Sequence, residues 1–282
     1  MARSIAAVIP GQRVIDDGDM QLWRALPNER RDTLGPFVFI DHYRHHSQRG
    51  IGDRPHPHAG IEVLSYLLEG SVVHRDSMGN TDRLDAGEAQ YILAGRGLLH
   101  AEVPQSGRHG LQLWTSLPPE MKHHAPRYQS YRADRFPLID RDGVRGKVLA
   151  GQVDGQEGPI HLASPTVWAV LHLKQDARIT LEVDPQAELG IYVLDGAITN
   201  STQQPIGKGN LVVLSNGDGS VHIATAPGQS ADVTLLGGAK VTWPQMFAGP
   251  FVMDTAERIV QAQRDYASGA WVRSMACRFN GM

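Results

Sequence analysis

The chain has 282 residues, of which 41% are hydrophobic and 20% charged, and its 27 basic and 30 acidic residues give a net charge of −3. This composition is typical of a soluble globular protein long enough for two domains, and it excludes the strongly basic surface that direct nucleic-acid binding requires. The single cysteine, Cys277, excludes an internal disulfide framework and favours a reducing, cytoplasmic location. The apolar run from Ile5 to Ile9 stops at Pro10, so we expect neither a secretory leader nor a membrane-spanning segment.

Thirty glycines and seventeen prolines separate short apolar runs along the chain, which predicts a turn-rich all-β fold. In chain order, the first segment that indicates chemistry is His56-Pro57-His58. Alternate residues of a β-strand face the same side, so both imidazoles can reach one interior point. His100-Ala101-Glu102 repeats this alternation further along. Two such strands facing each other would bring three imidazoles and one carboxylate together.

The donor atoms of this four-residue set narrow the kind of metal. Neutral imidazoles and one carboxylate, without a thiolate, suit a divalent first-row ion such as iron, manganese, nickel, copper or zinc. Such a set leaves coordination positions free, which indicates chemistry rather than a structural clip. A single His-x-His pair in a strand is more often packing or surface decoration, so the prediction depends on both pairs being present.

Both pairs stand within longer motifs. These are residues 55–62, 86–90 and 94–102 around the pairs, and 39–43, 74–80, 109–118 and 249–253 elsewhere. Together they resemble the pirin family of the cupin superfamily over most of the chain. The resemblance implies that the metal ligands are His56, His58, His100 and Glu102 and that the ion is Fe(II), with Mn, Ni, Cu and Zn as alternatives. Glu62 occupies the usual cupin carboxylate position, but the pirin-type set takes its carboxylate from Glu102.

An internal repeat predicts a second barrel. Residues 66–72 recur as 192–198, and residues 87–100 align with 209–222 without a gap. In this alignment the positions of His56, His58, His100 and Glu102 are taken by Glu182, Asp184, His222 and Ala224. We therefore expect a metal-free second barrel, in which Leu181 and Val183 face the interior while Glu182 and Asp184 face solvent.

The remaining histidines of the first half differ in their context. His45, His46, His123 and His124 lie in polar stretches and are expected on the solvated surface. His42 and His109 fall within the family-like motifs, where support for a ligand and plain packing are both open. Gln112 and Trp114 belong to an alternating strand of which one face is expected to line the pocket.

The expected organisation is two tandem cupin barrels, of the double-stranded β-helix or jelly-roll type, followed by a short helix. Residues 1–135 would form the N-terminal barrel with the metal site, and the polar, glycine-rich residues 136–160 a linker. Residues 161–245 would form the degenerate barrel, and 246–282 a helix and tail packing on the barrels. Asp254-Thr255-Ala256-Glu257 is typical of a helix start, and Gly269 of a helix stop.

The resemblance implies a dioxygenase that opens the central ring of a flavonol such as quercetin with O₂, giving a depside and carbon monoxide. Glu102, as the only carboxylate of the ligand set, would then take the hydroxyl proton of the substrate. The family also implies an alternative without turnover, a metal- or redox-responsive binding protein that acts on a protein partner. A zinc-dependent sugar isomerase would need phosphate-binding basic residues that the sequence does not reveal.

Overall fold

The computed structural model describes residues 2–273, so Cys277 lies outside the described residues. The chain divides into two compact units. Within the described residues, the unit of residues 15–22, 43–133 and 242–273 is called the first barrel, and that of residues 2–14, 23–42 and 134–241 the second barrel. No helix within residues 2–273 is long and apolar enough to cross a membrane.

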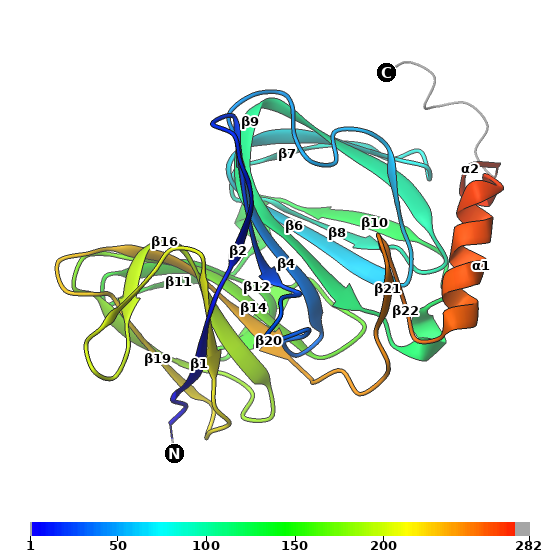
Figure 1. The fold of residues 1–282 in the computed structure, drawn as a ribbon. Helices are drawn as coiled ribbons and strands as arrows, with labels where there is room; N and C mark the ends of the chain where they lie inside the picture. Colours follow the sequence, from blue (N-terminus) through cyan, green and yellow to red (C-terminus); the bar gives the residue numbers. More distant parts are fainter. Residues whose placement is uncertain (1, 274–282) are drawn as a thin grey trace. The chain divides into compact units, whose positions relative to one another are not determined.

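The first barrel is built on the sheet with the strand order β10-β8-β6-β9-β4-β3-β2, in which β7 also pairs with β6 and β5 with β9 (Figure 1). Its strands are β2 (Gln12–Asp16), β3 (Met20–Leu26), β4 (Phe37–His45), β5 (His56–His58), β6 (Ile61–Asp76), β7 (Thr81–Asp85), β8 (Ala89–Leu93), β9 (Leu98–Ser116) and β10 (Arg127–Tyr131). The long strands β6 and β9 pair antiparallel over almost their whole length. Strands β2, β3 and β4 divide their residues between the two units.

The second barrel is built on the sheet β1-β18-β16-β20-β14-β12-β11, with β13 on β12, β17 on β16 and a separate β15-β19 pair. Its strands are β1 (Ile5–Pro10), β11 (Leu138–Arg141), β12 (Val144–Val153), β13 (Gln156–Pro159), β14 (Thr166–Leu173), β15 (Arg178–Glu182), β16 (Glu188–Thr199), β17 (Pro205–Gly207), β18 (Asn210–Leu214), β19 (Ser220–Ala224) and β20 (Ala231–Gly238). Inward residues of these strands form one apolar core. Each fully buried side chain of this kind, such as Leu181, contributes about 1.5–3 kcal/mol.

The division of the chain departs from the expected boundaries at three places, one of which is residues 23–42, expected in the first barrel but assigned to the second. Residues 2–14 belong with the second barrel, because β1 pairs antiparallel with β18. Residues 136–160, expected as a linker, form β11, β12 and β13 of that barrel. Asp142-Gly143 and Asp154-Gly155 take positive φ angles there, which is the turn geometry that joins antiparallel strands tightly.

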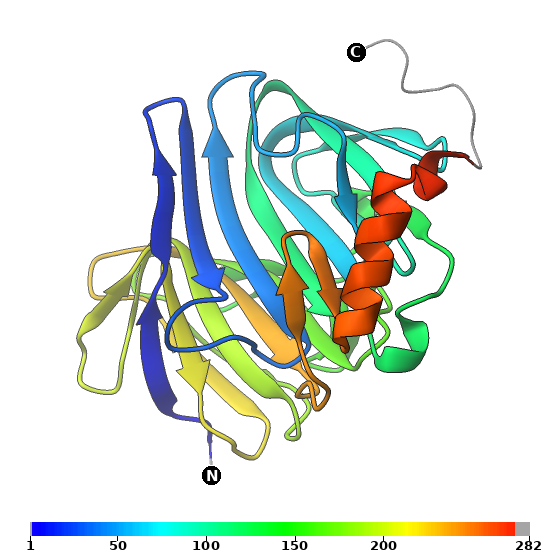
Figure 2. The ribbon, with the colours of Figure 1, turned by 45° about the vertical axis from the view of Figure 1, so that its right-hand side comes forward.

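The C-terminal segment packs on the first barrel. The hairpin of β21 (Met246–Ala248) and β22 (Phe251–Met253) leads into α1 (Ala256–Ala267) and α2 (Ala270–Arg273), and α1 lies along the hairpin (Figure 2). Thr255 caps α1 by accepting a hydrogen bond from the Arg258 amide at 3.3 Å. The expected helix is therefore present, and it starts from Thr255 as its cap. Phe251, Met253, Ala262 and Trp271 form an apolar cluster with Ala59 of the first barrel.

A buried lysine ties this segment to the barrel. The Lys122 Nζ donates to the carbonyls of Gly60 and Val252, both at 2.9 Å, and to the Ser116 hydroxyl at 3.0 Å. Burial lowers the pKa of Lys122 to about 7. Gly60 lies so close to β22 that a Cβ would come within 2.0 Å of the Val252 carbonyl oxygen, and its φ is +76°. A side chain is therefore excluded at Gly60, which lies two residues after His58.

Candidate metal centre

Strand pairing brings the two motifs together as the sequence predicts. Strand β5 pairs antiparallel with β9, with His56 directly opposite His100. On its other side β9 pairs with β6, where Asp76 lies opposite His100 and His74 opposite Glu102. Because paired and alternate positions share one face of a sheet, six side chains point to the same region of the first barrel: His56, His58, His74, Asp76, His100 and Glu102.

Three imidazoles form the first donor set. The ring centroid of His56 lies 5.0 Å from that of His58 and 4.3 Å from that of His100, and the His58 and His100 rings are 5.0 Å apart. One nitrogen from each of the three rings lies within 4.8 Å of the others. His58 and His100 are buried, whereas His56 is half-buried. The three imidazoles could therefore donate to one ion, and the half-buried His56 is the side of this site that solvent reaches.

Glu102 belongs to a second donor set, with His74 and His100, whose ligand atoms also lie within 4.8 Å of one another. Its Oε1 is 3.7 Å from His100 Nδ1. The same carboxylate is held by protein donors: Arg108 Nη1 lies 2.7 Å from Oε2, Ser65 Oγ lies 3.3 Å from Oε1, and the Gln90 amide donates to Oε1. His100 is thus the residue common to both sets, and Glu102 lies on the β6 side of it.

Arg108 is a buried cation at the centre of this arrangement. Its Nη2 donates to the Ile51 carbonyl at 2.7 Å, and its Nε to His45 Nδ1 at 3.3 Å. The guanidinium carbon also lies 4.6 Å from the centre of the Tyr43 ring, a cation–π contact. Burial raises the pKa of the Tyr43 hydroxyl to about 12. Arg108 therefore counters the charge of Glu102 while Tyr43 stays neutral beneath it.

His74 is oriented by a neighbouring carboxylate. Its Nε2 lies 3.3 Å from Asp76 Oδ2, and the remaining acceptor sites of Asp76 are taken by the Met78 and Asn80 amides and the Asn80 side chain. Burial opposes ionisation of Asp76, but the hydrogen bonds from His74 and Asn80 outweigh it and lower the pKa of this carboxyl. A carboxylate only accepts hydrogen bonds, so Nε2 of His74 is the donor in this contact, and the bond fixes the orientation of the ring.

The buried imidazoles are in the form that binds metal. Burial lowers the pKa of His58 well below its usual value, and electrostatic repulsion from the neighbouring His56 adds to this effect. Burial also lowers the pKa of His100, with further contributions from His56, His58, His74 and Arg108. Within residues 2–273, both ring nitrogens of His100 lack a hydrogen-bond partner, and so does Nδ1 of His74. Neutral, unpaired nitrogens next to a carboxylate fit a divalent cation.

Glu62 has a separate role, as expected from its position outside the pirin-type set. Its carboxylate accepts from the Tyr91 hydroxyl at 2.8 Å and from the Thr115 hydroxyl at 2.7 Å.

Gln112 and Trp114, by contrast, face the site from β9. Gln112 accepts from Ser65 at 2.8 Å, and the Trp114 ring stands edge-on to His58 at 5.0 Å.

The prediction that His45 is a solvated surface residue is wrong. Its side chain is 2% exposed, stacks on Tyr43 at 5.1 Å and accepts from Arg108. The end of β4 carries it inward, which the polar residues that follow it in the sequence do not reveal. His46, His123 and His124 are exposed, as predicted. Of the two histidines left open, His42 packs between Trp23 and Tyr192 in the second barrel, and His109 pairs with Glu69 at 3.0 Å.

The second barrel presents the expected contrast. Leu181 and Val183 are buried, while Glu182 and Asp184 are exposed, as the repeat predicts. His222 is exposed, and its Nδ1 lies 2.7 Å from the Thr180 hydroxyl. Among residues 2–273, the clusters of potential ligands all lie in the first barrel.

Sequence reasoning missed His74 and Arg108 as site residues. His74 and Asp76 alternate along a strand just as His56 and His58 do, and this spacing was an available signal. Arg108 gave no comparable signal, because it reaches Glu102 only through the folding of β9 against β4 and β5.

Comparison with known proteins places this geometry in a family. Two family models match, Pirin over residues 19–115 and the Pirin C-terminal cupin domain over residues 168–272. Pirin of Mus musculus is 33% identical over 249 residues, which cover 86% of this chain and 85% of that protein. A Vibrio cholerae protein provisionally named a quercetin 2,3-dioxygenase is 31% identical over 280 residues, 95% of this chain and 97% of that protein.

Solved structures show the same two-cupin fold. A quercetin 2,3-dioxygenase from Acinetobacter baumannii superposes with a TM-score of 0.87 at 24% identity, covering 96% of this chain and 99% of its own. A bacterial pirin from Escherichia coli in complex with nickel(II) superposes with a TM-score of 0.65 at 21% identity, covering 83% and 100%. The all-β fold of two tandem cupins predicted from the sequence is confirmed.

Proposed function

From the premise that this chain belongs to the pirin family of two-cupin proteins, we propose that it is a metal-dependent dioxygenase that cleaves a flavonol such as quercetin with O₂. The observation that carries the proposal is the group of imidazoles beside a carboxylate, which among residues 2–273 occurs in the first barrel alone. The similarity to the Vibrio cholerae protein over nearly its whole length supports the same reaction class.

The proposed ligands are His56, His58, His100 and Glu102, with Fe(II) as the ion and Mn, Ni, Cu or Zn as alternatives. A bound divalent ion would supply Lewis acidity and, for a redox-active metal, a means of engaging O₂. The nickel(II) complex of the Escherichia coli pirin supports a first-row ion in this fold. Glu102 would complete this set by turning Oε1 away from Gln90 towards the His56 side of His100, with Oε2 still bonded to Arg108.

Glu102 is the proposed base. Its buried carboxylate lies 3.7 Å from a ligand nitrogen, where it can accept the hydroxyl proton of a flavonol bound at the histidine cluster. Arg108 keeps the opposite oxygen in place through a bond of 2.7 Å, so the proton acceptor has a fixed pivot. Trp114, edge-on to His58, offers an apolar wall for an aromatic ring.

Quercetin turnover with measurement of carbon monoxide tests the proposal. Protein loaded with Fe(II) should consume quercetin and O₂ together and release one carbon monoxide for each quercetin, whereas the His56→Ala/His58→Ala variant should not. His123→Ala, which changes an exposed histidine, is the matched control and should retain activity. Absence of carbon monoxide with each of Fe, Mn, Ni, Cu and Zn would reject the dioxygenase and favour a metal-responsive binding protein.

A further inference from the structure

We propose that His74 is a metal ligand and that, with His100 and Glu102, it forms a second position for a divalent ion in the first barrel. This position shares two residues with the proposed ligand set but replaces the His56 and His58 pair. The inference concerns where an ion binds, and it holds whether or not the proposed reaction occurs.

The geometry of the three side chains carries the proposal. His74 and Glu102 face each other across β6 and β9, and His100 is two residues before Glu102 on the same face. One donor atom from each lies within 4.8 Å of the other two. His74 and His100 are fully buried, and Glu102 is 2% exposed. A single ion at their centre would thus receive two nitrogens and one oxygen without backbone movement.

The contact with Asp76 occupies one ring nitrogen of His74 and leaves the other for this position. Its Nε2 donates to Asp76 at 3.3 Å, while its buried Nδ1 has no hydrogen-bond partner among residues 2–273. A histidine that serves only packing would leave this buried nitrogen without a partner, which is unfavourable. In many metal sites a histidine binds the metal through one ring nitrogen and donates from the other to a carboxylate, which fixes the orientation of the ring.

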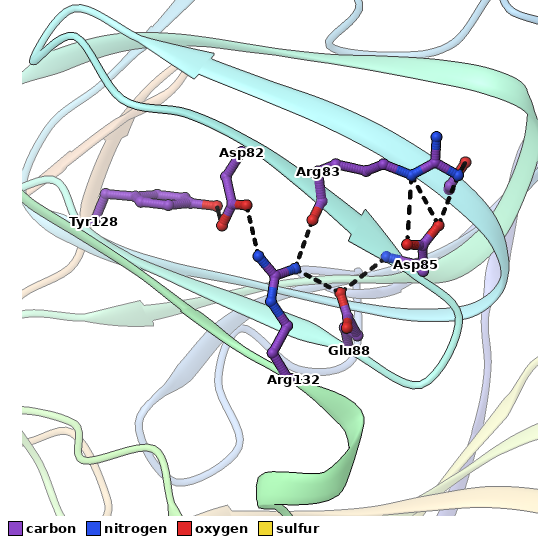
Figure 3. Close-up of polar contacts among 7 residues, drawn as sticks. Asp82, Arg83, Asp85, Glu88, Tyr128 and Arg132 are labelled. Atoms are coloured by element: carbon purple, nitrogen blue, oxygen red, sulfur yellow. Dashed lines mark hydrogen bonds and ion pairs between the residues drawn. The ribbon is translucent and has the colours of Figure 1, made fainter.

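The His74 ring is also fixed from outside the site. It stacks on the Tyr128 ring with a centroid distance of 4.2 Å and an interplanar angle of 12°. Figure 3 shows how Tyr128 is held in turn: its hydroxyl donates to Asp82 at 3.2 Å, and Arg132 bonds Asp82 and Glu88, both at 2.8 Å. The Tyr128–Asp82 hydrogen bond therefore joins β10 to β7, and Arg132, next to the end of β10, holds Asp82 in place for it, so the ring plane is fixed as preorganised ligands require.

The donor set defines the class of ligand. Two imidazoles and one carboxylate with open positions are the set that non-haem Fe(II) sites use, and Mn(II) and Co(II) share this preference. The three-imidazole set, by contrast, is all nitrogen. Because His100 and Glu102 serve both positions, we infer that the barrel holds one ion at a time. The carboxylate would follow the ion from one side of His100 to the other.

Metal titration without substrate tests the inference. The His56→Ala/His58→Ala variant removes the three-histidine position, and isothermal titration calorimetry with Co(II) should still show close to one ion per chain. Adding His74→Phe, which preserves the ring stacked on Tyr128 but removes both nitrogens, should abolish this binding. Adding Asp76→Asn instead should weaken it by about 10- to 100-fold, the usual effect of losing the partner of a ligand histidine.

Two controls exclude trivial outcomes. His109→Ala on the same background removes a histidine of the same barrel that pairs with Glu69 and should leave Co(II) binding unchanged. Circular dichroism of every variant should show the β signal of the parent protein, and His74→Gln replaces His74→Phe if the latter does not fold. The inference is overturned if the double variant binds no Co(II), or if Co(II) binds equally well with and without His74.

Discussion

Replacing Arg108 by methionine should destabilise the metal-free protein strongly. The guanidinium makes the 2.7 Å contact with Glu102, and both side chains are 3% exposed. Removing one partner of a buried pair leaves the other charge uncompensated, which costs about 3–5 kcal/mol. The same substitution at Arg132, whose side chain is 49% exposed although it also bonds two carboxylates, should cost about 0–1 kcal/mol.

Urea denaturation of metal-free protein, followed by circular dichroism, measures both losses in the free energy of unfolding. The source of the loss can be isolated with Glu102→Gln, which removes the negative charge. Because the uncompensated carboxylate is then absent, the Arg108→Met/Glu102→Gln double variant should be more stable than Arg108→Met alone. Equal losses for Arg108→Met and Arg132→Met, or a double variant less stable than Arg108→Met, would show that Arg108 does not serve as the counter-charge of Glu102.

Three further predictions concern the base, the buried histidines and the second barrel. Glu102→Gln should retain most of the metal but lose on the order of 10²-fold in kcat for quercetin, the scale of a positioned general base; unchanged kcat at full metal content would remove Glu102 from this role. Burial, followed by the charge of Arg108, lowers the pKa of His45 from 6.5 to about 4. As the pH falls, His45 is therefore protonated in the unfolded chain before it is protonated in the folded protein. The free energy of unfolding falls by about 3 kcal/mol between pH 6.5 and 4 as a result. His45→Gln should give a shallower loss in urea melts across that range, and an identical slope would contradict the assignment. Elemental analysis should find one divalent ion per chain in both the parent and His222→Ala, and two ions, or a loss on changing His222, would refute the asymmetry of the barrels.

The sequence predicted those features that depend on local alternation. His56, His58, His100 and Glu102 could be placed on one face because the two-residue period of a strand holds wherever the strands pair. The repeat likewise gave the inward positions of Leu181 and Val183, which the structure confirms. The two cupin barrels follow from the same patterns.

Features that depend on which strands become neighbours could not be predicted in this way. The position of Glu102 on the His74 side of His100 follows from the pairing of β6 with β9, and its contact with Arg108 from the course of β9 beyond it. His45 was assigned to the surface because its sequence neighbours are polar, whereas its burial is decided by Tyr43 and Arg108. The assumed linker was different, because the two Asp-Gly turns within residues 136–160 were a readable hairpin signal.

The attachment of the C-terminal segment to the first barrel determines the order in which the protein can be completed during synthesis. A ribosome releases the chain from its N-terminus, and the last strand of the second barrel ends at Gly238, before the β21–β22 hairpin emerges. The histidine-bearing barrel, although encoded first, lacks the Val252 acceptor of Lys122 and the Phe251 and Trp271 side chains until nearly the whole chain has been made. A chain terminated before Met246 would therefore carry the candidate metal-binding histidines in a barrel that lacks these contacts.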